Sequence, residues 1–153
     1  DLLTTFDVLE HIEDDAAALR EVARVLEPGG RMVATVPANP WMWGAQDEVS
    51  HHFRRYTAAG LRAAIADSGL ELERLTHFNT LLFPPIAAIR LLRRLRPRSG
   101  EAESDFGMPG GDGALNRALA AIFGLEAGWV ARPGLPALPF GVSLLAVARA
   151  PER

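Results

Sequence analysis

The chain has 153 residues, which is enough for one domain with a hydrophobic core. Its formal net charge is −3, so it has no overall positive field of the kind that nucleic-acid-binding proteins use. It contains no cysteine, which excludes disulfide bonds and thiolate metal sites. We find no signal peptide and no uninterrupted membrane-spanning run in the sequence, and we expect a cytoplasmic location.

The first 37 residues predict a strand, a helix and a second strand. Leu2, Leu3 and Phe6 predict a first strand at about 1–7, and the acids at 13–15 suit the electropositive start of a helix. Apolar residues then recur at helical spacing, and they are Leu19, Val22, Ala23 and Leu26. Gly29 and Gly30 end this helix, and 31–36 forms the second strand.

A strand, a crossover helix and a strand of this length form a βαβ unit with parallel strands. In such sheets ligands bind beyond the carboxyl ends of the strands. The segment from Asp7 to Ile12 and the segment that follows Pro37 are therefore expected to meet at one site.

Several short motifs occur in a fixed order: DVLEHI at 7–12, LEPGG at 26–30, YT at 56–57, DSGL at 67–70 and FGVSLL at 140–145. In this order the chain resembles the C-terminal half of a class I S-adenosylmethionine-dependent methyltransferase of the small-molecule group. The resemblance implies an α/β, doubly wound, Rossmann-like sheet, mostly parallel with an antiparallel last strand. It also implies S-adenosyl-L-methionine as cofactor, bound in part by Asp7, Val8, Leu9 and Glu10.

The family's first three strands and its glycine-rich cofactor loop have no counterpart in this sequence. We therefore expect the chain to be part of a longer protein and to be inactive by itself. It would form a single domain over 1–153, with a helical insertion at 79–139.

The loop at 38–56 is rich in aromatic, histidine and arginine residues and follows the second strand. Aromatic rings provide flat apolar walls, and arginine can bind a carboxylate or a phosphate with two parallel hydrogen bonds. The alternative is that the tryptophans only cover the end of the sheet and the arginines are solvated. The residues predicted to bind substrate are Trp41, Trp43, His51, Arg54, Arg55 and Tyr56.

Further along the chain, a helix is expected from Thr57 to Ser68, and strands are expected at 70–78 and 140–148. The insertion contains two apolar helices, at 81–95 and 114–130, joined by a flexible linker at 97–113. The helices could form a lid over a bulky apolar substrate, or contact a membrane surface through 81–96 and 114–130, or simply pack on the sheet.

Methyl transfer from a sulfonium requires alignment of the reactants and, for a hydroxyl or amine acceptor, removal of a proton. Histidine suits the second task, and we predict His11 and His52 as catalytic residues. A purely structural role for His11, bonded to local backbone, remains the alternative.

Asp7, Glu10 and His11 are also similar to the E-x-x-E-H metal site of some catechol-type and RNA-end methyltransferases. Because the sequence identifies no further ligand, we expect no metal site.

The predicted function is therefore methyl transfer to a small, apolar or lipid-like acceptor, without nucleic-acid binding. The alternative is a non-catalytic binding or membrane-associating module that retains half of the methyltransferase fold.

Overall fold

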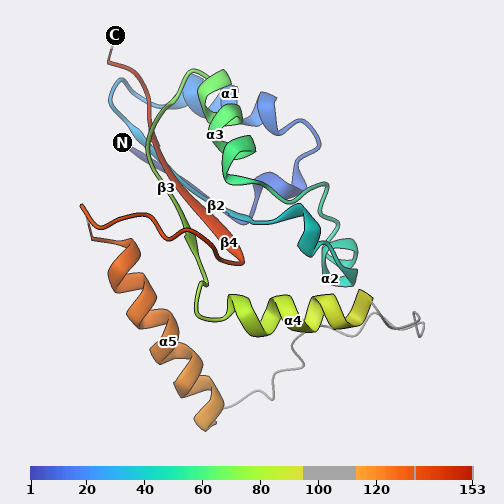
Figure 1. The fold of residues 1–153 in the computed structure, drawn as a ribbon. Coiled ribbons are helices and arrows are strands. Elements are labelled where there is room, and N and C mark those ends of the chain that lie inside the picture. Colours follow the sequence, from blue (N-terminus) through green and yellow to red (C-terminus); the bar gives the residue numbers. More distant parts are fainter. Residues whose placement is uncertain (95–112, 133, 153) are drawn as a thin grey trace.

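The computed structural model describes residues 1–94, 113–132 and 134–152. Its four strands are β1 (Leu2–Phe6), β2 (Arg31–Pro37), β3 (Glu71–Phe78) and β4 (Ser143–Arg149). They form one sheet in the order β1-β2-β4-β3 (Figure 1). β1 and β2 are parallel, and β4 runs antiparallel to both β2 and β3. The predicted mixed α/β sheet with an antiparallel last strand is therefore confirmed.

Two helices, α1 (Asp15–Val25) and α3 (Ala58–Asp67), cover one face of the sheet (Figure 1). Each begins at a side-chain cap: Asp14 accepts from the N–H of Ala17, and Thr57 accepts from the N–H of Gly60. Between these helices and the sheet lies the core, which contains Leu19, Val22, Met32, Ala34, Leu61, Ile65, Leu144 and Ala146.

The connections after β1 and β2 lie side by side, because the two strands are parallel and their carboxyl ends point the same way. Both connections contain short helices. A 3-10 helix spans Leu9–His11, a second spans Pro40–Met42, and α2 spans Ala45–Val49. The prediction of a plain loop over 38–56 is thus wrong for these last two segments. The backbone N–H of Gly44 donates to the side chain of Asp47 at 2.9 Å, so a local contact fixes the first turn of α2.

The insertion contains α4 (Phe83–Arg94) and α5 (Ala114–Val130). Pro84 and Pro85 lie in the first turn of α4, where proline is tolerated because the first N–H groups of a helix have no partner within it. Residues 97–112 of the predicted linker lie outside the described residues. Both helices expose large apolar side chains, namely Ile89, Leu91, Leu92, Phe123, Leu125 and Trp129. None of the described helices is long and apolar enough to cross a membrane.

Candidate functional site

The segments that follow β1 and β2 are joined to each other directly. The N–H of Phe53 donates to the backbone oxygen of Glu10 at 2.7 Å. Next to this bond, the imidazole rings of His11 and His52 meet edge to face, with centroids 4.6 Å apart. The structure thus brings together the two histidines, from different segments, that were predicted from the sequence as catalytic residues.

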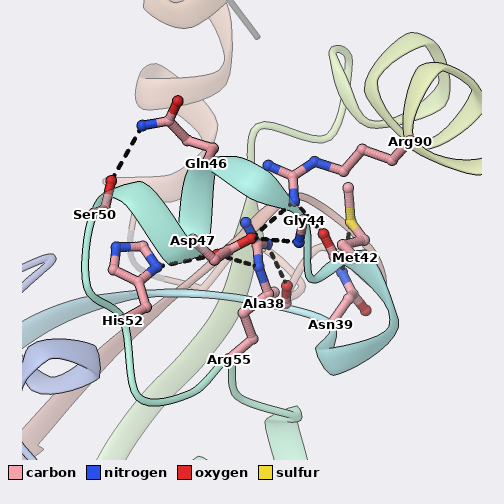
Figure 2. A network of polar contacts seen from close by, with 10 residues as sticks. All are labelled: Ala38, Asn39, Met42, Gly44, Gln46, Asp47, Ser50, His52, Arg55 and Arg90. Atoms are coloured by element: carbon pink, nitrogen blue, oxygen red, sulfur yellow. Dashed lines mark hydrogen bonds and ion pairs between the residues drawn. The ribbon is translucent and has the colours of Figure 1, made fainter. Parts of the chain in front are cut away.

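A buried carboxylate, that of Asp47, organises the second of these segments (Figure 2). Its Oδ1 atom accepts from Nε of Arg55 at 2.7 Å and is 3.0 Å from Nδ1 of His52. Its Oδ2 atom accepts from Arg90 of α4 at 3.1 Å, and Arg90 also donates to the backbone oxygen of Met42. One acid therefore holds the loop, α2 and α4 together.

The charges around Asp47 determine its pKa and the position of the proton on His52. Burial by itself would raise the pKa of Asp47, but the hydrogen bonds and the charge of Arg55 bring that pKa below its usual value. Asp47 is then ionised near neutral pH and can only accept hydrogen bonds. The proton that His52 shares with it must lie on Nδ1, which leaves Nε2 of a neutral His52 without a proton.

A second acid, Asp15, holds the end of the same loop. Tyr56 donates its hydroxyl proton to Oδ2 of Asp15 at 2.7 Å, and Arg54 donates to Oδ1. Burial raises the pKa of Tyr56, and its bond to Asp15 raises it further, so the phenol stays protonated. Tyr56 is only 6% exposed.

Glu10 is a buried acid without a complete set of partners. It is 1% exposed, and its Oε2 atom has no hydrogen-bond partner among the described residues. Burial raises the pKa of Glu10, and the nearby carboxylate of Asp7 raises it as well. Such a group is rare in a folded chain because an unpaired buried carboxyl costs free energy.

The predicted cofactor segment, 7–10, divides into an outer and an inner half. Asp7 and Val8 are exposed, whereas Leu9 is 1% exposed and packs in the core. Asp7 has a φ of 51°, and its N–H donates to both the backbone oxygen and the hydroxyl of Thr35. Of these four residues, Asp7 and Val8 offer exposed surface to a molecule as large as a cofactor.

The remaining predicted substrate residues differ in their surroundings. Trp41 is exposed and meets Phe83 of α4 edge to face, with centroids 6.1 Å apart. Trp43 is half-buried, and His51 is exposed with a φ of 55°. Arg54 and Arg55 already hold protein carboxylates. The role of these residues in substrate binding stays a prediction.

A cavity of about 790 Å³ lies elsewhere, over the sheet face that α1 and α3 do not cover. It is bounded by α5 on one side and by Val33, Leu145 and Val147 of the sheet on the other. None of the predicted site residues lines it. The cavity and the cluster around His11 and His52 are therefore separate features.

Three residues of the network were not predicted from the sequence: Asp15, Asp47 and Arg90. Asp15 was assigned to a helix start and Arg90 to an apolar helix, while Asp47 was only one member of a polar loop. The available signal was an acid beside two histidines and two arginines at 47–55, because such an acid has several cations to pair with.

Comparison with known proteins agrees with this architecture. Residues 1–75 match the family model described as a methyltransferase domain. No curated protein matches the chain.

Several solved structures share the fold. One is a chain of the Haloferax volcanii complex between the Trm112 methyltransferase activator and a methyltransferase: it is 18% identical, with a TM-score of 0.52, and the match covers 100% of this chain and 54% of that one. An S-adenosylmethionine-dependent methyltransferase from Mesorhizobium loti is 18% identical, with a TM-score of 0.52. The match covers 97% of this chain and 61% of that one.

Phosphoethanolamine N-methyltransferase 2 of Haemonchus contortus, in complex with S-adenosyl-L-methionine, is 14% identical with a TM-score of 0.50, covering 98% of this chain and 33% of that one. The chain thus spans less than two thirds of each of these three proteins. At this level of identity the likeness shows the fold.

Proposed function

Because this chain has the class I methyltransferase fold and matches a methyltransferase domain over residues 1–75, we propose that it forms the acceptor-side half of an S-adenosylmethionine-dependent methyltransferase. The acceptor is proposed to be small and apolar or lipid-like. The observation that carries the proposal is the direct contact between the segments that follow β1 and β2. These two segments bring His11 and His52 together beyond the carboxyl ends of the strands, where such sheets bind ligands.

The cofactor is proposed to lie against Asp7 and Val8, beyond the end of β1. These are the exposed residues of the predicted segment, and the carboxylate of Asp7 offers an acceptor for a charged amino group. When bound, S-adenosyl-L-methionine supplies an electrophilic methyl group on a sulfonium. The chain's own contribution is to orient the acceptor and to take up its proton.

His52 is suited to take up that proton through Nε2, since Asp47 holds the other ring nitrogen. His11 lies against the same ring and can serve the same purpose. As the acceptor atom forms its bond to the methyl carbon, the carbon–sulfur bond breaks and its electron pair stays on sulfur. The acceptor proton passes to the imidazole.

A titration with S-adenosylhomocysteine tests the proposal. Because the chain spans about half of the Haloferax volcanii protein that it matches, the measurement is made on residues 1–153 and on the product of the complete reading frame. We expect saturable binding by the complete product, and weaker binding by the variant Asp7→Ala. Absence of binding by the complete product would contradict the proposal.

A second candidate is a non-catalytic, membrane-associating module. It is favoured by the apolar side chains that α4 and α5 expose, among them Leu92 at 61% and Leu125 at 73%. Co-sedimentation with anionic liposomes, together with no binding of S-adenosylhomocysteine, would favour this candidate over the enzyme.

A further inference from the structure

The contact between the two segments creates a cluster that the sequence did not predict. One ligand atom each from Glu10, His11 and His52 lies within 4.8 Å of the other two. Asp7, which the sequence-based hypothesis included, is not a member of the cluster. His52 takes the third place in the cluster. The local sequence motif did not identify it, because it lies 41 positions after His11 along the chain.

We propose that Glu10, His11 and His52 bind a divalent transition-metal ion of the zinc type. Two imidazoles and one carboxylate are a ligand set that such ions use, with a further position open to water or to a substrate atom. Magnesium and calcium prefer sets made of oxygen atoms, so the two histidines disfavour them.

The spacing of the cluster suits one ion. Zinc–ligand bonds are about 2.1 Å long, so two ligand atoms of the same ion are at most about 4.2 Å apart. The cluster, at 4.8 Å, needs to contract by roughly half an ångström. His11 is exposed, so its ring can move by that amount without disturbing the core.

The buried oxygen of Glu10 is a second and independent observation. Oε2 is in a residue that is 1% exposed and has no hydrogen-bond partner among the described residues. A bound cation would satisfy this atom, which otherwise costs free energy as an unpaired buried group.

His52 is held as a metal-binding histidine usually is. Its Nδ1 donates to the buried carboxylate of Asp47, which fixes the ring and leaves Nε2 available as a ligand. Arg55 in turn fixes Asp47 through a bond of 2.7 Å (Figure 2). The carboxylate, the imidazole and the metal position thus form the series seen around many zinc ions.

This inference does not depend on methyl transfer. It does limit the proposed mechanism, because a histidine nitrogen bound to a metal cannot accept a proton at the same time. With the ion bound, the open coordination position would face an acceptor oxygen in place of a free imidazole.

The test is a calorimetric titration of the chelator-treated protein with ZnCl₂, with the visible absorption of Co²⁺ as a second readout. We expect one Zn²⁺ per chain and no heat with MgCl₂. His11→Gln and His52→Gln should each lower the zinc affinity by at least about tenfold. Glu10→Gln keeps the shape of the buried side chain and should do the same, so loss of folding cannot explain the result.

The matched control is His51→Asn. His51 is exposed and lies outside the cluster, and asparagine tolerates its positive φ. This variant should bind zinc as the unmodified protein does. Equal affinity in all four variants, or an equal loss in His51→Asn, would overturn the proposal. Since no cofactor is added, the result is independent of the titration with S-adenosylhomocysteine.

Discussion

The carboxylate of Asp47 connects several parts of the candidate site. It is 0% exposed and accepts from Arg55, Arg90, His52 and the N–H of Gly44. A buried acid with two arginines is stable only as a set, because its removal would take the opposite charge of the carboxylate away from two guanidinium groups in a poorly hydrated region. Asp47 consequently holds the middle of the segment that follows β2, while Asp15 holds its end through Arg54 and Tyr56.

We predict that Asp47→Ala lowers the free energy of unfolding by about 3–5 kcal/mol, the usual cost of removing one partner from a buried ion pair. The measurement is urea denaturation followed by circular dichroism. The control is Glu21→Ala, which breaks an exposed ion pair with Arg24 and should cost about 0–1 kcal/mol. Equal losses in the two variants would show that Asp47 does not have the role assigned to it.

Some residues of the candidate site could be predicted from the sequence and others could not. His11, His52 and Tyr56 were recognised because their chemical types suit a site at the ends of parallel strands. The pairing of Asp47 with Arg90 joins positions 43 residues apart, and no local pattern indicates it. The same holds for Asp15 and Tyr56, whose bond joins positions 41 apart.

The strands and the two helices that cover the sheet follow from local sequence pattern. Apolar runs, capping residues and glycines place β1, β2, β3, α1 and α3 close to where the structure has them. β4 begins at Ser143, later than the predicted 140, because Phe140 and Gly141 belong to the connection. α2 was missed because its five residues are too few for a helical period.

The connection into β4 depends on a close approach at Gly141. A methyl group built on Gly141 would overlap the backbone oxygen of Phe78 in the neighbouring strand. We predict that Gly141→Ala destabilises the protein, because backbone atoms of β3 would have to move. Thermal unfolding followed by circular dichroism measures the effect as a lower Tm.

Gly128→Ala is the matched control for this substitution. Gly128 lies inside α5, and a methyl group there would meet no atom within 4 Å. Alanine should stabilise the helix by about 0.5–1 kcal/mol and raise the Tm. If the two substitutions shifted the Tm in the same direction, the packing described around Gly141 would be wrong.

The sheet of the described residues has an exposed edge at β1. Leu2 is 65% exposed and Phe6 is 56% exposed on this strand. An exposed apolar edge strand can pair with another chain. The compared proteins are longer than this chain, and the match covers all or nearly all of it.

We predict that a protein made of residues 1–153 self-associates through β1 in a concentration-dependent manner. Phe6→Lys should reduce the association, since a charge on an edge strand opposes pairing. Val25→Lys is the control, because Val25 is 51% exposed but lies on α1. Sedimentation velocity over a range of concentrations gives the answer, and association that responds only to Val25→Lys would assign the contact to α1.

We propose that ligands bind where the segments after β1 and β2 meet. An NMR titration of the isotope-labelled complete product with S-adenosylhomocysteine tests this at individual residues. We predict the largest shifts at the amides of Asp7 and Val8 and at the imidazole signals of His11 and His52. Shifts confined to Val33, Phe123 and Leu145, which line the separate cavity beside α5, would contradict the claim.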